Sequence, residues 1–299
     1  MPDLSIPALT RLGSNPLAIA RASGARDFLM ICEENARRVV SGQRDPRAAG
    51  QKDVLAQMLA RETKPWAQRG AVAVIPVSGL LLKDYPWIGD SWATGYVQLR
   101  WQIGEALADP AVGGIALWID SPGGYVSGLF ELTAFIREAR ERKPVAAIVD
   151  GVAASAGYAI AAAASTVATG RFGVVGSIGV MAVHWDFSRA LDEFGVVPTL
   201  LFAGKHKVDG NSLQPLPDEV KTRWLAEMEE MRRVFADDVA AGRGAAMDAA
   251  AALATEAAVY SGPSGAAEAK RIGLVDEVMP PDEALDAFVD HLSGAAGEP

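Results

Sequence analysis

From Ala71 onward the sequence alternates short apolar runs with longer amphipathic segments, and this order restricts the possible folds more than any other property of the chain. The apolar runs include "AVAVIPV", "GGIALWID" and "PVAAIV". The segments with helical spacing include "TGYVQLRWQIGEALAD" and "YVSGLFELTAFIREARER". A strand–helix–strand order predicts a mostly parallel sheet with flanking helices. We therefore expect an α/β fold for this part of the chain.

The pattern continues beyond this region. We expect short strands and turns through residues 166–187, a short helix over 188–195, a strand over 197–210, a long helix over 217–241 and a last helix over 281–292. Residues 1–68 differ in character and predict an N-terminal helical extension that ends in a linker. The chain then divides into this extension, a domain over residues 69–292 and a flexible tail over 293–299.

Composition excludes several classes of function. Half of the 299 residues are hydrophobic, which is enough for a large core. The net charge of −9 argues against nucleic acid as the main partner. The single cysteine, Cys32, cannot form an intrachain disulfide, and we expect no metal and no cofactor. The first residues carry Asp3 and Arg11 and do not resemble a secretory signal, so we expect a soluble protein without a membrane anchor.

The run "DGVAASAGYAIAAAAS" follows the strand "PVAAIV" and places Ser155 where strand gives way to helix. Serine is a favoured helix N-cap, and this is the simpler local interpretation. A serine at that point can also be a nucleophile once a base removes its proton. The helix dipole and the backbone N–H of Ala156 would then stabilise the developing oxyanion.

A second glycine-rich turn, "DSPGG", follows the strand before it. The carboxyl ends of parallel strands meet at one edge of the sheet, where sites form. Acyl transfer needs two N–H donors aimed at one oxyanion. Gly124 is the natural second donor, and Gly123 supplies the conformational freedom of the turn. The two turns together favour a catalytic site more strongly than either does alone.

A base is also required, and the candidates are few. His291 lies in the last helix and is expected to face solvent, whereas His184 is expected to be a packing residue. Along the strand expected over residues 197–210, Lys205 and Lys207 would share one face and His206 would take the other. A lysine in a desolvated pocket loses its proton more easily and can serve as a base. A Ser–Lys dyad and a Ser–His pair both remain open from the residues alone.

At these residues the sequence resembles the signal peptide peptidase A (protease IV) family of serine peptidases, over residues 71–278. The motifs that carry the resemblance are "VAVIPVSGLL", "IDSPGG", "ASAGYAIAAAAS", "GVVGSIGVM" and "GLVDEV". Within the family, "GKHKVDGN", "LPDEV" and "TEAAVYSG" resemble the capsid-assembly (prohead) proteases of lambda-type tailed phages. The N-terminal extension without a membrane anchor is also similar to that subgroup.

The resemblance implies a ClpP/crotonase-like fold and a Ser–Lys dyad. The family nucleophile falls on Ser155 and the family base on Lys207. Gly124 and Ala156 take the oxyanion-donor positions. A further family serine, which orients the lysine amine, falls on Ser177. Because the lysine must be neutral, activity is expected to fall at acidic pH.

The resemblance also implies a role. It predicts a serine endopeptidase that processes scaffold, portal or capsid proteins during phage head maturation, as a homo-oligomer inside the procapsid in the host cytoplasm. No nucleic acid, cofactor or metal takes part in this prediction. The cleavage site is expected to carry small or apolar residues.

Other functions remain open. The same fold supports crotonase-type acyl-CoA enzymes, and residues 1–68 with the helix 217–241 could make a non-catalytic capsid- or scaffold-binding component. Lambda-type proteases often carry a long C-terminal extension that overlaps the scaffold protein, whereas this sequence ends soon after "DAFVDHL". The scaffold is then encoded separately, the sequence is a fragment, or the chain is a bacterial homologue outside a phage.

Overall fold

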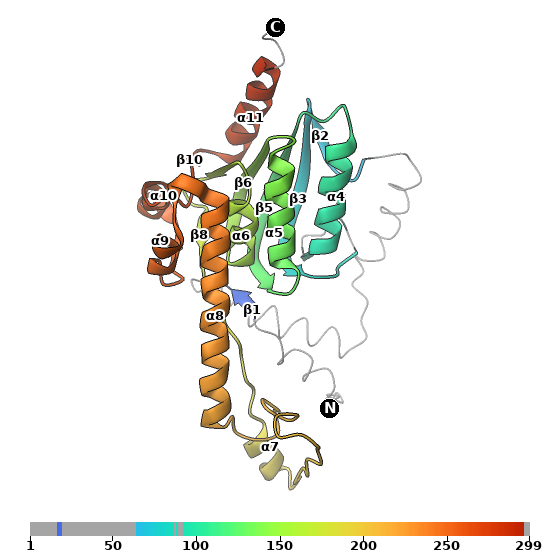
Figure 1. The fold of residues 1–299 in the computed structure, drawn as a ribbon, viewed down its shortest axis with the longest axis vertical. Coiled ribbons are helices and arrows are strands. Elements are labelled where there is room, and N and C mark those ends of the chain that lie inside the picture. The colour runs from blue at the N-terminus through green and yellow to red at the C-terminus, as the bar shows by residue number, and fades with distance from the viewer. Residues whose placement is uncertain (1–16, 20–63, 87, 89–91, 296–299) are drawn as a thin grey trace.

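The computed structural model describes residues 17–19, 64–86, 88 and 92–295 (Figure 1). The strands are β1 (Leu17–Ile19), β2 (Ala67–Arg69), β3 (Val72–Leu82), β4 (Ala93–Gly95), β5 (Gly114–Tyr125), β6 (Val145–Ala154), β7 (Thr166–Thr169), β8 (Val174–Gly176), β9 (Val259–Tyr260) and β10 (Glu277–Val278). The helices are α4 (Tyr96–Ala108), α5 (Leu129–Arg140), α6 (Ala156–Ala162), α7 (Ser188–Glu193), α8 (Asp218–Arg243), α9 (Ala249–Ala254), α10 (Gly262–Arg271) and α11 (Pro281–Ala295), with a 3₁₀ turn at Gly244–Ala246.

The ten strands found among the described residues form one sheet, whose main path runs β10-β7-β6-β5-β3-β2. Every neighbouring pair on this path is parallel except β2 with β3. β4 and β8 add further parallel pairs to β3 and β6. Parallel strands buried on both faces carry near-continuous apolar runs, as β3, β5 and β6 do. The expectation of a mostly parallel sheet with flanking helices is confirmed.

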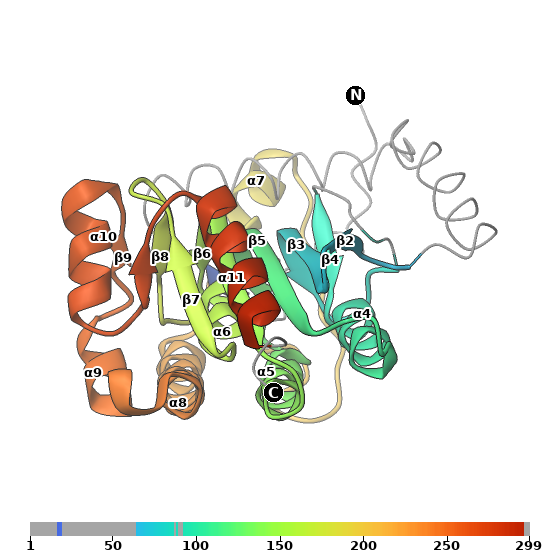
Figure 2. The ribbon, with the colours of Figure 1, turned by 90° about the horizontal axis from the view of Figure 1, so that it is seen from above.

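The sheet lies between two layers of helices (Figure 2). On one face, Leu99 of α4, Ile136 of α5 and Phe235 of α8 belong to the larger apolar core, together with α6. On the other face, Leu285 of α11 packs with Ile148 of β6 in a smaller core. The short helix α6 is therefore held between the sheet and α8, and its N-terminus is set by the core around it.

An arm, made of residues 182–217 and the N-terminal half of α8, extends away from the sheet (Figure 1). Pro217 precedes α8. The negative charges of Asp218 and Glu219 in its first turn interact favourably with the positive end of the helix dipole. Helix α8 has 26 residues, and its buried side chains after Val220 begin only at Phe235. The long helix was expected, but the strand expected over residues 197–210 is wrong, because this segment forms turns and irregular backbone.

The N-terminal region differs from expectation at one point. Residues 17–19 form strand β1 rather than helix. The other residues expected as helices before residue 64, including Cys32, lie outside the described residues. Strand β2 falls in the segment expected as a linker, and α11 continues to Ala295. The division into extension, peptidase domain and tail stays a prediction.

The part of the chain that the structure describes contains neither a membrane-spanning helix nor a cluster of metal ligands. None of its helices has both the length and the apolar character needed to cross a bilayer. Nor do three or more His, Cys, Asp or Glu side chains gather there in a way that could hold a metal ion.

Candidate active site

Ser155 joins β6 to α6 in a strained conformation. Its φ of 54° and ψ of −123° lie outside the regions that non-glycine residues ordinarily adopt. The residue is fully buried, and its Oγ has no hydrogen-bond partner among the described residues. The hydroxyl caps no N–H of α6, so the helix-cap interpretation does not account for it. A sharp strand-to-helix turn of this kind is the geometry of a nucleophile elbow.

Small residues allow the elbow to form against the neighbouring strand. Ala154, Ala156 and Gly157 are all buried. A Cβ on Gly157 would lie 2.9 Å from the carbonyl oxygen of Ser121 in β5. Any larger residue at position 157 would push α6 away from the sheet. The alanine- and glycine-rich sequence thus lets the start of α6 rest directly on β5.

The segment "DSPGG" was expected to form a turn, but it belongs to strand β5, and it is organised around the buried Ser121. Its Oγ donates to the carbonyl oxygen of Gly79 at 2.7 Å and accepts from the N–H of Gly123 at 3.1 Å. Gly123 has a φ of +112°, which favours glycine. A Cβ on Gly124 would lie 1.9 Å from the carbonyl oxygen of Leu81 in β3. The N–H of Gly123 is therefore occupied, and Gly124 must be glycine because of its contact with β3.

The two predicted oxyanion donors belong to elements that touch. Ala156 is the first residue of α6, where backbone N–H groups have no partner within the helix. Gly124 lies three residues beyond Ser121, against which α6 packs through Gly157. The structure thus brings the C-terminal part of β5 and the start of α6 together at the same end of the sheet. Their role as oxyanion donors stays a prediction.

Ser177 also lies next to the elbow. Ala154 of β6 pairs with Gly176 of β8, and the N–H of Ser155 donates to the carbonyl oxygen of Gly176 at 2.9 Å. Ser177 is buried and has a φ of 57°, and its N–H donates to the carbonyl oxygen of Ala258 at 2.8 Å. The structure therefore places this predicted base-orienting serine directly beside the candidate nucleophile.

The predicted base lies elsewhere in the single chain. Lys207 is exposed in the arm, and its N–H donates to the carbonyl oxygen of Gly204 at 3.0 Å within a turn. The segment that holds it lies at the end of α8 far from the sheet (Figure 1). The Oγ of Ser155 has no hydrogen-bond partner among the described residues, so Lys207 does not reach it within one chain.

The other candidate bases have different partners. Lys205 forms an ion pair with Glu219 at 2.9 Å. His206 contacts Asp209 at 2.8 Å and does not contact the serine. The Nε2 of His184 lies 2.9 Å from the carbonyl oxygen of Asn211, and the ring meets the edge of Trp224. These contacts agree with a packing role for His184. His291 is exposed in α11, as expected.

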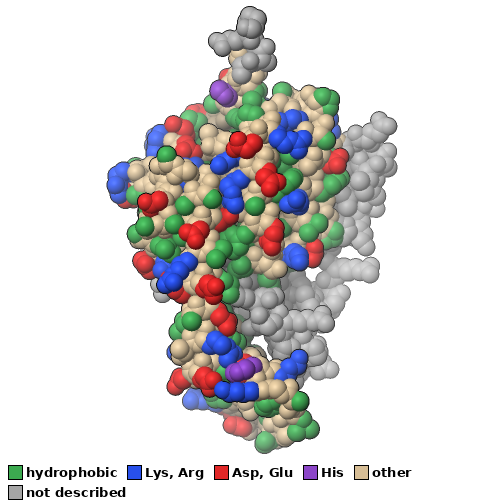
Figure 3. Space-filling model, in the orientation of Figure 1, with side chains coloured by type: hydrophobic (Ala, Val, Ile, Leu, Met, Phe, Trp, Pro, Cys, Tyr) green, Lys and Arg blue, Asp and Glu red, His purple; other side chains and the backbone are tan. Residues whose placement is uncertain are grey.

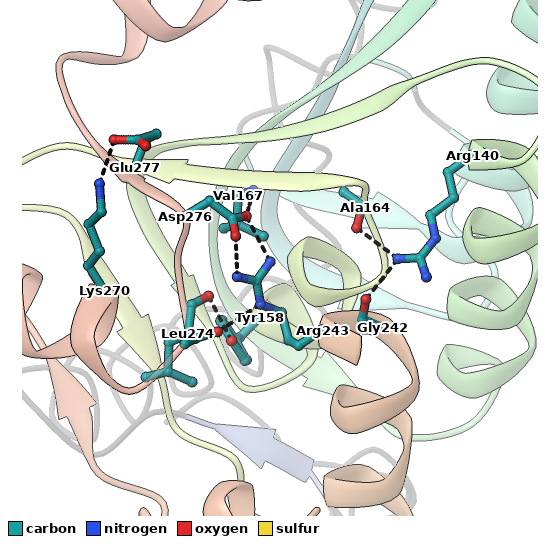
Figure 4. A network of polar contacts seen from close by, with 11 residues as sticks. Arg140, Tyr158, Ala164, Val167, Gly242, Arg243, Lys270, Leu274, Asp276 and Glu277 are labelled. Carbon is teal, nitrogen blue, oxygen red and sulfur yellow. Dashed lines mark hydrogen bonds and ion pairs between the residues drawn. The ribbon is translucent and has the colours of Figure 1, made fainter. Parts of the chain in front are cut away.

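A buried polar network holds α6 from behind (Figure 4). The hydroxyl of Tyr158, one turn into α6, donates to the carbonyl oxygen of Leu274 at 2.9 Å. The guanidinium of Arg243, at the end of α8, binds both carboxylate oxygens of Asp276, at 2.7 and 2.9 Å. Asp276 also accepts from the N–H of Val167 in β7 at 2.7 Å. The network ties α6, α8 and the sheet together behind the elbow.

The charge state of this network follows from its contacts. Burial alone would raise the pKa of the Asp276 carboxyl, but hydrogen bonds from Arg243 and from the Val167 N–H outweigh it, so this pKa lies below its usual value. The carboxylate is therefore ionised at neutral pH and pairs with a guanidinium that is itself almost fully buried. Nothing in the sequence motifs pointed to Arg243 or Tyr158 as supports of the site.

A mostly parallel α/β sheet with a strained, buried serine at a strand-to-helix turn is an arrangement that serine hydrolases use. The chain belongs to peptidase family S49, which matches residues 137–293. It is 38% identical over 236 residues to capsid assembly protease C of Escherichia phage lambda, covering 78% of this chain and 52% of that protein.

Other relatives extend the comparison. The head-tail preconnector protein GP5 of Enterobacteria phage P21 is 37% identical over 223 residues, which cover 74% of this chain and 43% of that protein. Protease 4 of Salmonella typhi is 32% identical over 55% of this chain and 25% of its own length. The chain thus spans about half of the lambda protein and less than half of the P21 protein.

Among solved structures, an enoyl-CoA hydratase/isomerase family member matches with 18% identity and a TM-score of 0.41, over 76% of this chain and 74% of that one.

Proposed function

We propose that this protein is a serine endopeptidase and that Ser155 is its nucleophile. The observation that carries the proposal is the Ser155 hydroxyl, which is buried, strained and unpartnered among the described residues. Keeping a residue in such a conformation costs about 1–3 kcal/mol and is typical of active sites. A buried hydroxyl without a partner adds to that cost. Membership of peptidase family S49 supports the same reaction.

The proposed reaction has two steps. Neutral Lys207 takes the proton from the Oγ of Ser155, which attacks the scissile carbonyl carbon. The N–H groups of Gly124 and Ala156 stabilise the oxyanion. Lys207 then gives the proton to the leaving amine, and an acyl ester remains on Ser155. In the second step Lys207 takes a proton from water, the hydroxide attacks the ester carbonyl carbon, the bond to the Oγ of Ser155 breaks, and Lys207 returns the proton to Oγ as the acid leaves. Ser177 would hold the lysine amine in place.

We infer that Lys207 comes from a second copy of the chain. Within one chain the lysine is exposed on the arm and does not reach the serine. The arm also exposes large apolar side chains (Figure 3), among them Phe194 at 81%, Val197 at 83% and Leu201 at 92%. Exposed apolar surface of this kind favours association. An arm that packs on a neighbouring copy would bury these side chains and carry its lysine to the neighbour's elbow.

A complementation experiment tests this proposal. Ser155→Ala and Lys207→Ala are each expected to abolish hydrolysis of a peptide or casein substrate. Co-expression of the two variants should restore part of the activity, because mixed assemblies contain sites with one intact serine and one intact lysine. Lys205→Ala and His206→Ala are the matched controls and should stay active. An active Lys207→Ala variant would overturn the dyad, and a lack of complementation would overturn the shared site.

The names of the phage relatives support a biological role. A capsid assembly protease and a head-tail preconnector protein are both similar to this chain over about three quarters of its length. We propose that the substrates are scaffold, portal or capsid proteins, and that cleavage takes place in the procapsid within the host cytoplasm. A portal gene upstream and a major capsid gene downstream are the genomic neighbours expected for this role. Co-expression with those neighbours should yield specific cleavage products that Ser155→Ala does not produce.

A further inference from the structure

Strand β5 continues beyond the point where β6 leaves it. The last residues that β5 and β6 pair are Ser121 and Ala153. On its other side β5 stays paired with β3 as far as Gly124. Among the described residues, no parallel strand pairs with this edge of β5 beyond Ser121. Ser155 directly follows β6, so the candidate nucleophile lies where this edge opens.

Strand β1 from the N-terminal region takes this edge in the antiparallel direction. Leu17 pairs with Tyr125, Ala18 with Gly124 and Ile19 with Gly123. Ala18 is therefore opposite the residue predicted to donate an oxyanion N–H. The strand reads Leu-Ala-Ile and has no charged residue.

An extended peptide that adds to a strand edge is held by main-chain hydrogen bonds, which do not depend on the peptide's sequence. Its backbone lies parallel to the edge and brings successive carbonyl groups past it. At the end of β5 such a peptide would run past the predicted oxyanion donor and the elbow. The β1–β5 pairing thus has the geometry of a bound peptide.

We propose that Gly123–Tyr125 is the edge to which a peptide substrate adds, and that Leu17–Ile19 of the same chain occupies it as an internal competitor. The N-terminal segment then keeps the peptidase autoinhibited until β1 leaves. This inference rests on the function proposed above, because it assumes that Ser155 acts on a peptide lying along this edge. Substrate entry and β1 pairing exclude one another.

The fraction of time that β1 occupies the edge determines how much the apparent affinity for a peptide is lowered. A site open for only a fraction of the time binds its ligand more weakly by that fraction. If β1 fills the edge about nine tenths of the time, the apparent affinity for a peptide falls about tenfold. Loss of β1 pairing should therefore tighten peptide binding without any change at the elbow.

Disulfide trapping tests the pairing in the full chain. The protein carries Leu17→Cys and Tyr125→Cys in a Cys32→Ser background. Directly opposite residues of antiparallel strands lie about 4.5–5.5 Å apart between Cα atoms, which suits a disulfide. The matched control keeps Tyr125→Cys and moves the partner to Ala18→Cys, one residue out of register and on the other face.

Mild oxidation should link positions 17 and 125 within one chain, seen as a monomer on a non-reducing gel and as the crosslinked peptide by mass spectrometry. The control pair should form far less of this product. Equal yields from the two pairs, or a disulfide that joins two chains, would overturn the proposal.

Peptide binding tests the competition without relying on catalysis. A Ser155→Ala version binds a fluorescent peptide that copies residues 14–24, and anisotropy reports the Kd. Ala18→Pro removes a main-chain donor from β1 and should tighten binding about tenfold. The control Gln43→Pro also adds a proline to the N-terminal region, but outside β1, and should leave the Kd unchanged. Oxidation of the 17–125 cysteine pair should abolish binding, and reduction should restore it.

The outcomes separate this inference from the proposed function. An unchanged Kd in Ala18→Pro, or full binding by the oxidised protein, would overturn autoinhibition even if Ser155 proves to be a nucleophile. If the trapping and binding results hold but the intact serine never cleaves the peptide, the edge is a peptide site with an internal competitor, and the proposed peptidase function fails instead.

Discussion

The backbone N–H of Ser155 donates to the carbonyl oxygen of Gly176 across 2.9 Å, at the point where β6 passes into α6. This bond joins the candidate nucleophile to the residue immediately before Ser177. Both serines have positive φ angles and both are buried. Each serine donates its backbone N–H to a carbonyl oxygen of a neighbouring segment, Ser155 to Gly176 of β8 and Ser177 to Ala258 just before β9, so backbone hydrogen bonds fix both positions.

Replacement of Ser155 by glycine should stabilise the protein while it inactivates it. Glycine adopts a φ of 54° without strain and removes a buried hydroxyl that has no hydrogen-bond partner in the described part of the chain. We expect a gain of about 1 kcal/mol, or about 2–4 °C in Tm, and a loss of hydrolysis of at least about 10⁴-fold. Thermal unfolding and a peptide assay measure both. A lower Tm in Ser155→Gly would show that the elbow is not strained.

Gly124→Ala should damage both stability and activity. A Cβ there would lie 1.9 Å from the carbonyl oxygen of Leu81, so β3 and β5 must separate. Forcing extra atoms into such a contact costs about 1–3 kcal/mol. Gly104→Ala in α4 is the control, because among the described residues no atom outside the adjacent backbone of α4 lies within 4 Å of its Cβ position, and it should stabilise the helix by up to about 1 kcal/mol. Urea unfolding of the two variants should move in opposite directions.

Ser121→Ala should lower kcat more than it raises KM. The variant loses the hydroxyl that accepts from the Gly123 N–H and donates to the Gly79 carbonyl, so the end of β5 that carries the predicted oxyanion donor loosens. A misplaced donor weakens the transition state more than the bound substrate. We expect kcat to fall about fivefold, since one hydrogen bond contributes about 1 kcal/mol.

Ser165→Ala is the control for this variant. Its hydroxyl also accepts a backbone N–H, that of Val145, but at the opposite end of β6. Its kcat should match the wild type. An equal fall of kcat in both variants would mean that the loss of activity comes from general destabilisation rather than from a change at the end of β5.

Asp276→Asn should destabilise the protein at neutral pH but not in acid. The folded-state pKa of Asp276 lies below its unfolded value, about 3.9. Its ion pair with Arg243 therefore stabilises the fold above about pH 4, and this contribution is lost as pH falls through the folded pKa. The carboxylate is about one third exposed, so we expect only about 1 kcal/mol at pH 7.

Tm measured from pH 7 down to about pH 3 should show the gap between wild type and Asp276→Asn closing. Glu268→Gln, which breaks an exposed pair with Arg271, should change Tm little at any pH. If the difference in Tm between wild type and Asp276→Asn stayed constant down to about pH 3, the loss of stability could not be assigned to the carboxylate charge.

Local sequence was sufficient for much of the fold. The apolar runs predicted β3, β5 and β6 because strands buried on both faces need continuous hydrophobic residues. The amphipathic segments predicted α4, α5, α8 and α11 for the corresponding reason. The two glycine-rich segments predicted that the end of β5 and the start of α6 would meet, because the carboxyl ends of parallel strands share one edge; the "DSPGG" segment does so as part of strand β5 rather than as a turn.

Three features depended on contacts that no local pattern contains. The segment around Lys207 was predicted to be a strand. In the structure it pairs with no described strand and forms turns on the arm. Residues 17–19 have helical spacing, yet they pair with β5 at the edge that β6 leaves open. Arg243 and Asp276 meet from two distant elements to brace α6. Periodicity shows which face of a helix or strand is apolar. The residues that pair with a strand edge or with a buried charge depend on how distant parts of the chain pack together.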